Sequence, residues 1–211
     1  MREILLEEIL HLDQRYRANL INSIGGFKSV AMVGTKSRSG HSNLAIFNSF
    51  FHLGAHPPLF GFIVRPDSVE RHTLENILET NSFTVNHLNE YNYKQAHQTS
   101  ARYPKETSEF DATGLQEEYI NGFYPPFVLG SKIQIGAEFQ QKTDVSANGT
   151  ILIVAKIQLI RIEEEVIGKD GFIDLEKSGT ITCSGLDCYH RTQKLSRLSY
   201  AKTDRTTTEI D

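Results

Sequence analysis

The sequence predicts a mainly β protein, an antiparallel barrel that is closed or nearly closed, with α-helices at its periphery. Apolar and polar residues alternate through residues 133–139, as in a strand with one buried face. The turn signal Asn148-Gly149 leads into a long apolar segment, 151–162, which predicts a hairpin. Other short apolar segments are joined by tight polar turns, and many strands joined in this way favour a barrel.

Size and composition limit the kind of protein. The chain has 211 residues, enough for one domain with its own core, and we expect a single domain over residues 1–211. Its formal net charge of −4 argues against nucleic acid as a partner. No run of about 18 apolar residues is present, which argues against a membrane partner. The N-terminus is too charged for a signal peptide, so a cytoplasmic location is expected.

The first elements expected are a helix and two strands. Apolar residues recur at spacings of three and four between residues 3 and 24, which predicts an amphipathic helix that ends at Gly25-Gly26. The pattern then changes to alternation, and residues 27–35 predict a strand. After a polar turn, residues 43–50 predict a second short strand.

The next elements alternate between strand and helix. Residues 58–64 are apolar on both faces, which is typical of a buried strand. Residues 71–81 have the apolar spacing of a helix, and residues 82–88 return to a strand.

The middle of the chain is less regular. Residues 93–103 predict a helix that Pro104 ends, and the segment from there to Pro126 predicts loops and one short helix. After the predicted hairpin, short strands are expected around Gly171, Gly179 and Gly185.

Two polar segments flank the strand 58–64, and both are rich in groups that bind anions. The loop before it carries small polar side chains, whereas residues 65–73 bring two arginines and two hydroxyls to a helix start. Neither the dinucleotide glycine pattern nor the lysine of a nucleoside-triphosphate loop is present. Because both segments flank one strand, they predict a mononucleotide site. The alternative is that Thr73 caps the helix and the arginines form a solvated face.

The order of motifs around these segments is specific. A strand ends in V-G-T and is followed by N-L-A-x-x-N-S, P-P-L, R-P-x-S-x-x-R-x-T-L-x-N-I and F-T-V-N. This order resembles the flavin reductase-like family of FMN-binding split-barrel proteins, and the likeness runs from about residue 20 to about residue 200. The resemblance implies a Greek-key split β-barrel, a homodimer, and FMN bound near the subunit interface.

The resemblance also implies which residues hold FMN. Residues 43–45 run beside the isoalloxazine ring, with main-chain groups near its polar edge, and residues 48–49 and 65–73 lie around the ribityl phosphate. The cofactor-binding residues implied in this way are Asn43, Leu44, Ala45, Phe47, Asn48, Ser49, Arg65, Ser68, Arg71, His72 and Thr73.

The substrate pocket over the flavin is expected to involve two further side chains, His97 and Tyr103. In an alternative interpretation, His97 packs on the barrel instead. No set of residues indicates a catalytic triad or a metal site.

The function that follows from the resemblance is that of a flavin reductase. A reduced nicotinamide, NADH or NADPH, would pass electrons through flavin to an unidentified small-molecule acceptor. The cofactor carries out the bond chemistry, so the absence of a catalytic constellation is consistent with this activity. The alternative is an FMN-binding or electron-carrying module without NAD(P)H turnover, because a fold does not by itself fix a reaction.

Overall fold

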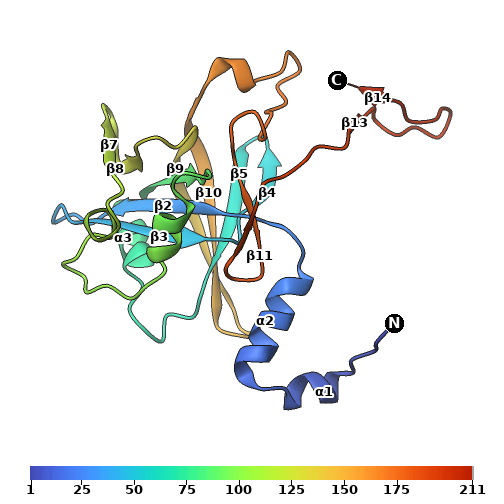
Figure 1. The fold of residues 1–211 in the computed structure, drawn as a ribbon. Helices are drawn as coiled ribbons and strands as arrows, with labels where there is room; N and C mark the ends of the chain where they lie inside the picture. The colour runs from blue at the N-terminus through green and yellow to red at the C-terminus, as the bar shows by residue number, and fades with distance from the viewer. Residues whose placement is uncertain (211) are drawn as a thin grey trace.

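A seven-stranded antiparallel sheet forms the body of the molecule in the computed structural model, which describes residues 1–210 (Figure 1). Its strand order is β3-β2-β6-β9-β10-β5-β4. The strands are β2 (Ala31–Lys36), β3 (Ser42–Phe47), β4 (Phe51–Ala55), β5 (Pro58–Val64), β6 (Ser82–His87), β9 (Ile133–Val145) and β10 (Thr150–Ile162). The predicted mainly β antiparallel fold is confirmed.

The sheet curls into a split barrel. β3 and β4 stand at opposite ends of the strand order, yet only residues 48–50 connect them. The last residue of β3 and the first of β4 are four residue steps apart and thus at most about 14 Å from each other, so the two ends of the sheet must come close together. β3 and β4 are not hydrogen-bonded to each other, and the barrel is therefore split between them.

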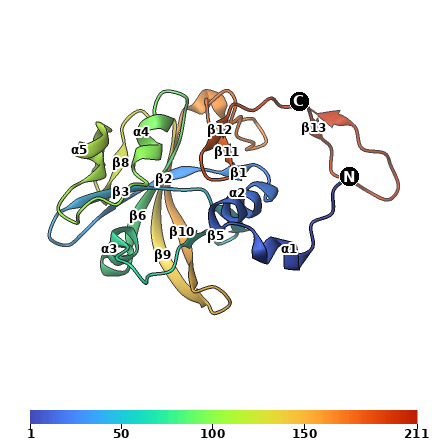
Figure 2. The same ribbon diagram turned by 60° about the horizontal axis from the view of Figure 1, so that its bottom comes forward.

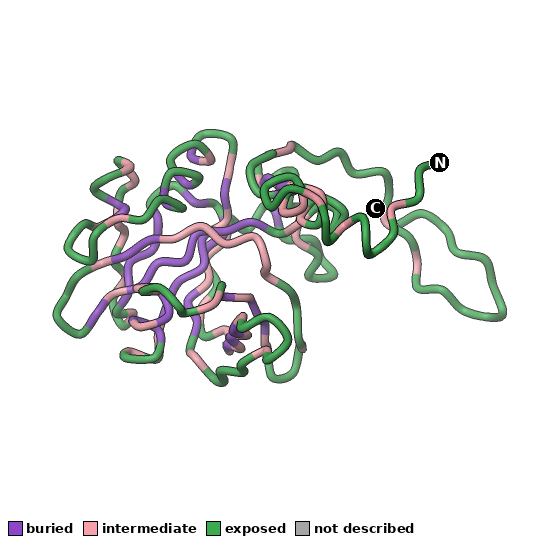
Figure 3. The backbone as a smooth tube through the Cα atoms, turned by 90° about the horizontal axis from the view of Figure 1, so that it is seen from below, coloured by how far each residue is buried: buried purple, intermediate pink, exposed green. Residues whose placement is uncertain are grey.

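Two apolar clusters lie on opposite faces of β2. Ala31 and Val33 pack inside the barrel with a group of phenylalanines that includes Phe62 and Phe83, whereas Val30 and Met32 pack outward. Figure 3 shows the strands of the barrel as its most buried part. Because β2 is buried on both faces, it fixes its neighbour β3 firmly in place.

Helices and short hairpins cover the barrel. α3 (His72–Thr80) packs against β2 and β3, and α4 (Tyr93–Gln98) and α5 (Glu109–Thr113) also lie against β3. The remaining elements are β7 (Glu117–Ile120), β8 (Phe123–Val128), η1 (Glu164–Val166), a small sheet of β1 (Lys28–Ser29), β11 (Thr182–Ser184) and β12 (Cys188–His190), and a terminal hairpin of β13 (Arg197–Leu198) and β14 (Glu209–Ile210).

The single N-terminal helix predicted at residues 3–24 is wrong in one respect. The segment forms two helices, α1 (Leu6–His11) and α2 (Gln14–Ile24). Neither helix contains a buried residue. Leu12 and Asp13 leave the helical conformation between them, and the Asp13 carboxylate accepts the backbone N–H groups of Arg15 and Tyr16. Asp13 therefore begins a new helix by capping it. Within residues 1–210, no helix is both long and apolar enough to cross a bilayer.

The middle of the chain also differs from expectation. Residues 117–128 form the β7–β8 hairpin where loops were predicted, and α4 ends at Gln98 although a helix to residue 103 was expected. The shorter helix leaves residues 99–103 as an irregular segment, which forms part of the site described next.

Candidate functional site

A cleft of about 1030 Å³ lies beside β3, between the start of α3 and residues 97–103. Among the site residues predicted from the sequence, all except Leu44 and Ser68 line it. These lining residues are Asn43, Ala45, Phe47, Asn48, Ser49, Arg65, Arg71, His72, Thr73, His97 and Tyr103. The fold therefore gathers two segments that flank one strand, as the sequence predicted, and adds a third segment to face them.

One face of β3 forms a wall of the cleft. Asn43, Ala45 and Phe47 alternate along the strand and all line the cleft. The Asn43 side-chain amide donates to Thr73 Oγ1 at 3.0 Å, and both side chains are buried. This bond ties the strand to the start of α3, so the wall and the helix start are held as one unit.

The outer edge of β3 is free of strand partners. The Leu44 side chain is buried in the core, but its N–H points away from β2 and donates to Glu109 Oε2 at 2.9 Å. Main-chain groups two residues apart point to the same edge of a strand, so Ile46 N–H also faces outward. Ile46 lines the cleft, and a main-chain edge is thus presented there. Any role of Leu44 is therefore through its main chain.

Asn48 and Ser49 form the corner that connects β3 to β4. Asn48 donates from its amide to Gly185 O at 3.2 Å. Ser49 Oγ accepts Ile63 N–H at 3.0 Å and donates to Ile63 O at 3.1 Å. Both side chains line the cleft, and these bonds fix the corner against β5 and the β11–β12 turn through the Asn48 amide N–H and the Ser49 hydroxyl.

The first turn of α3 is open to a ligand. Arg71 occupies the N-cap position and makes no side-chain cap bond. Thr73 does not cap the helix, since its hydroxyl accepts from Asn43, so the alternative interpretation of Thr73 as the cap is wrong. Within residues 1–210, the backbone N–H groups of His72, Thr73 and Leu74 donate to no protein acceptor. Such groups favour an anion.

Arginines gather around this helix start. Arg71 is half-buried, and its Nε and Nη2 atoms both donate to Pro66 O at 3.1 Å. Burial lowers the pKa of Arg71, and Arg65 and Arg102 lower it further, which places both cations nearby. Asp67 opposes this effect only in part. The site therefore holds a concentration of positive charge in a chain whose net charge is negative. Ser68 lies exposed in the loop and outside the cleft lining.

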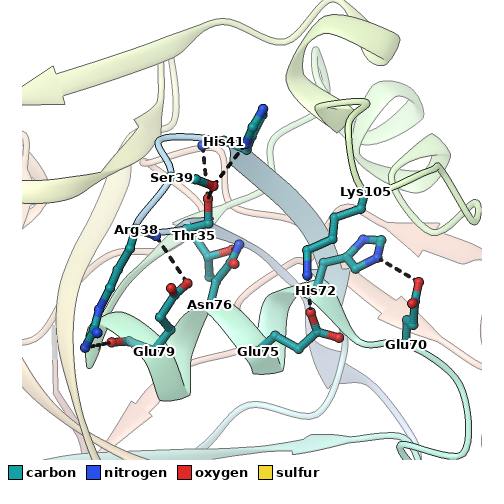
Figure 4. Close-up of polar contacts among 11 residues, drawn as sticks. Thr35, Arg38, Ser39, His41, Glu70, His72, Glu75, Asn76, Glu79 and Lys105 are labelled. Atoms are coloured by element: carbon teal, nitrogen blue, oxygen red, sulfur yellow. Dashed lines mark hydrogen bonds and ion pairs between the residues drawn. The ribbon is translucent and has the colours of Figure 1, made fainter.

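The carboxylates of α3 do not neutralise these arginines. Glu79 is hydrogen-bonded to Arg38, and Glu75 forms an ion pair with Lys105, as Figure 4 shows. The distance from Lys105 Nζ to Glu75 Oε2 is 2.7 Å. The ion pair with Lys105 lowers the pKa of Glu75.

Another acid at this end of α3, Glu70, lies beside a histidine. Glu70 Oε2 is 3.5 Å from His72 Nε2. His72 Nε2 is buried and has no aligned hydrogen-bond partner within the described residues.

The opposite wall carries the two residues predicted for the substrate pocket. The ring nitrogen His97 Nδ1 lies 2.8 Å from the Tyr189 hydroxyl, in a hydrogen bond. Tyr103 OH accepts from Gln98 Nε2 at 3.0 Å. Both residues line the cleft, so of the two interpretations of His97 the structure favours the lining one. Burial raises the pKa of Tyr189 to about 12, which keeps its hydroxyl protonated.

Two charged residues, Arg102 and Glu109, are among the lining residues that the sequence analysis missed. Arg102 lies on residues 99–103, and Glu109 begins α5 with its side chain buried. Burial raises the pKa of the Glu109 carboxyl, while the Leu44 N–H bond opposes this. Both lie in the irregular middle of the chain, and no local pattern there indicated their position.

Comparisons with known proteins agree with this architecture. The family model described as the flavin reductase like domain matches residues 27–175. A split-barrel protein of Shewanella frigidimarina NCIMB 400, described as a candidate flavin reductase, is 45% identical with a TM-score of 0.92, covering 95% of this chain and 100% of that chain.

Two further solved structures share the fold at lower identity. The 2-nitrobenzoate 2-nitroreductase of Pseudomonas fluorescens is 22% identical, with a TM-score of 0.80 over 96% of this chain and 98% of its own. An FMN-binding protein of Thermus thermophilus with bound 1-cyclohex-2-enone is 18% identical, with a TM-score of 0.66 over 79% of this chain and 86% of its own.

Proposed function

The chain belongs to the flavin reductase-like domain family, and on that premise we propose that it is an FMN-binding oxidoreductase. It takes electrons from NAD(P)H and passes them through flavin to a second, small-molecule acceptor. One observation carries the proposal: a free strand edge and an unneutralised cationic helix start line the same cleft. The FMN-binding protein of Thermus thermophilus and the nitroreductase of Pseudomonas fluorescens, which share the fold, support it.

The start of α3 fits the phosphate of FMN. Its N–H groups at His72, Thr73 and Leu74 have no protein acceptor, and the buried His72 Nε2 makes no hydrogen bond within the described residues, although Glu70 lies 3.5 Å from it. Arg71 is held by Pro66, and Arg65 and Arg102 act on it more strongly than the one carboxylate nearby, that of Asp67. A dianionic phosphate would satisfy these donors and remove the repulsion among the arginines.

The wall formed by β3 fits the ring of FMN. The outward edge of β3 near Ile46 offers main-chain donors and acceptors, and Ala45 and Phe47 offer apolar surface. Bound FMN supplies a ring that exchanges hydride and electrons. The protein's part is to orient that ring, and the side chains of Phe47, His97 and Tyr103 exclude water from it.

The reductant would use the same cleft. The sequence has no dinucleotide fingerprint, so NADH or NADPH would stack over the flavin rather than occupy a domain of its own. A volume of about 1030 Å³ is at the upper end of the roughly 300–1,000 Å³ that is usual for ligand pockets. This leaves room for a second ring system.

Two measurements test the proposed function. Purified protein is titrated with FMN, and the flavin absorbance of the loaded protein is then followed under anaerobic addition of NADH or NADPH. We expect saturable binding and then bleaching of the flavin bands by at least one nucleotide. A chain that binds no FMN contradicts the proposal. A loaded chain that neither nucleotide bleaches is an electron-carrying module instead.

We also propose that the protein is a homodimer. Neither α1 nor α2 buries a residue, and Ile24 and Phe27 are 72% and 71% exposed. Isolated helices of this length are marginal in water. The C-terminal arm, residues 191–210, extends from the barrel on the side of the N-terminus, with Leu195 98% exposed (Figure 2).

A second copy is the occupant that fits this unpartnered face. Residues 1–13 carry four acidic residues and one arginine. Residues 191–206 carry five basic residues and one aspartate; two of the basic residues, Arg191 and Arg197, already pair with Glu90 and Asp170, and Lys194, Lys202 and Arg205 form no ion pair within residues 1–210. The two ends are therefore complementary in charge, and a two-fold pairing would bring one against the other. Asn22 of α2 lines the cleft, so the partner would also border the site.

A further inference from the structure

Arg102 faces the cleft from a different wall than the other two arginines. Arg65 and Arg71 belong to the connection between β5 and α3, whereas Arg102 lies on residues 99–103, which follow α4. Ser100 lines the cleft from the same segment. The Gln98–Tyr103 bond and the Lys105–Glu75 ion pair hold the segment at both ends. The position of Arg102 is thus set by the fold.

Arg102 has no counter-ion in the protein. Within residues 1–210, it forms no ion pair and no hydrogen bond, and its charge lowers the pKa of Arg71. Three acids of the α3 region have other partners: Glu75 is bound to Lys105, the Glu79 carboxylate accepts the Arg38 N–H, and Glu70 lies beside His72. A cation held over a cleft without a partner favours an anionic ligand.

The cofactor phosphate does not need Arg102. Arg71, Arg65 and the free N–H groups of α3 already provide two cations and several donors at one end of the cleft. Arg102 is exposed and lies on a separate segment, whereas Arg71 is half-buried and fixed to Pro66. An exposed cation on a separate wall is available to a second ligand after the cofactor is in place.

We propose that Arg102, with Ser100, forms an anion subsite that selects the substrate rather than the cofactor. The substrate then carries a phosphate or carboxylate group, and it is either an anionic electron donor or an anionic acceptor. The subsite rests on the proposed function, because it describes the second ligand of the flavin cleft. It makes Arg102 a specificity-determining residue and gives it no part in the chemical step.

Equilibrium binding to FMN-loaded protein tests the subsite. Arg102→Ala is compared with the wild type by calorimetric titration with two anions, NADP⁺ and 4-nitrobenzoate, and with their uncharged counterparts, nicotinamide and nitrobenzene. The Kd for FMN is measured separately on the unloaded proteins. Lys94→Ala removes a positive charge from α4 outside the cleft and serves as the matched control.

We expect Arg102→Ala to raise the Kd of one of the two anions by about tenfold, as the loss of a charge-assisted hydrogen bond does. The Kd for FMN and for both uncharged compounds should change less than about twofold. If only the affinity for NADP⁺ falls, the electron donor is the anionic substrate. The same variant should then show a raised KM for NADPH at unchanged kcat. If only the affinity for 4-nitrobenzoate falls, the electron acceptor is the anionic substrate. Arg102→Lys should recover part of the affinity.

Three results overturn the subsite. One is unchanged binding of both anions, which makes Arg102 a solvated side chain. Another is an equal loss of affinity for charged and uncharged compounds, which indicates that the substitution changes the shape of the cleft. The third is weakening of FMN as large as that from Arg71→Ala, which assigns Arg102 to the cofactor phosphate. A wild-type chain that binds no FMN is a separate failure, since it contradicts the proposed function itself.

Discussion

At the scale of single residues, Arg71 is the side chain on which cofactor binding most depends. Pro66 O fixes its guanidinium through two hydrogen bonds, and burial keeps it partly dehydrated beside two other cations. A guanidinium held in this way loses little conformational freedom when it binds a phosphate. Its dehydration and the repulsion from the neighbouring cations are unfavourable in the protein without ligand, and a bound anion would offset both.

Arg71→Ala should therefore weaken FMN far more than riboflavin, which lacks the phosphate. Charge-assisted hydrogen bonds are worth about 1.5–3 kcal/mol, which corresponds to a roughly 10- to 100-fold loss of affinity. Fluorescence titration with both flavins measures the difference. Arg38→Ala is the matched control, because Arg38 binds Glu79 at the other end of α3. Equal losses for FMN and riboflavin would remove Arg71 from the phosphate site.

His87 predicts a specific dependence of stability on pH. Burial lowers the pKa of His87 from 6.5 to about 4, and the ring nitrogen Nδ1 lies 3.3 Å from the Thr180 hydroxyl, in a hydrogen bond. Between these two pH values the unfolded chain binds a proton that the folded chain does not. The free energy of unfolding should therefore fall as pH drops through this window, by up to about 1.4 kcal/mol per unit.

His87→Gln tests this dependence. Urea unfolding between pH 4 and pH 7 should show a shallower decline for the variant than for the wild type, because the titrating group is gone. His52→Gln, at an exposed position on β4, should leave the slope unchanged. A wild-type slope that persists in His87→Gln would assign the decline to other groups.

At the scale of elements, β3 connects the fold to the site. One edge pairs with β2, one face supplies Asn43, Ala45 and Phe47 to the cleft, and the free edge is partly covered by α5. From α5, Glu109 bonds that edge through Leu44 N–H. The edge near Ile46 thereby stays available while the strand itself remains anchored.

Glu109→Ala should destabilise the protein by about 1–3 kcal/mol, because it leaves a buried N–H without an acceptor. Glu109→Gln keeps an acceptor oxygen and should cost less. Urea denaturation gives both values. Glu106→Ala changes an exposed acid three residues earlier and should have almost no effect. Similar losses for Glu106→Ala and Glu109→Ala would mean that α5 is not anchored through this bond.

The elements that could be predicted from the sequence are those determined by residues close together in the chain. Strand 58–64 was predicted at its observed bounds, because its apolar residues are stopped by Arg65-Pro66. The β7–β8 hairpin was missed although Asn121-Gly122 is a hairpin turn, because Pro125-Pro126 argue against a strand. Pro126 O is satisfied by Thr84 Oγ1 at 2.7 Å, a contact that local sequence does not reveal.

The same distinction applies to the site. Residues 43–49 and 65–73 flank one strand, so their meeting could be predicted from the topology alone. Arg102 and Glu109 come to the cleft through tertiary contacts, namely the Lys105–Glu75 ion pair and the Leu44 N–H bond. A segment whose position depends on such contacts carries no periodic signal of its own.

At the scale of the whole molecule, the barrel is well packed, whereas neither terminal segment is. The core clusters lie within residues 30–183, and the N-terminal helices and the C-terminal arm are largely exposed (Figure 3). The hairpin β13–β14 has two residues per strand and is too short to be stable alone. Arg197 attaches it to the barrel through Asp170. The proposed second copy would bury the rest.

Leu195→Asp should therefore shift the protein toward monomer. The residue is 98% exposed in one chain, so the change should not affect a monomer, whereas a charge at a buried interface opposes association. Sedimentation velocity over a range of concentrations measures the change. Asp204→Ser, at an exposed site on the same arm, is the control. A wild type that sediments as a monomer, or a variant that dimerises equally well, would contradict the proposed interface.

The central claim is that the cleft beside β3 holds FMN with its phosphate at the start of α3. Equilibrium titration of the purified chain with FMN and with riboflavin tests it most directly. We predict saturation at one FMN per chain, with riboflavin bound at least about tenfold more weakly because it lacks the phosphate. No binding of FMN, or equal affinity for the two flavins, would contradict the claim.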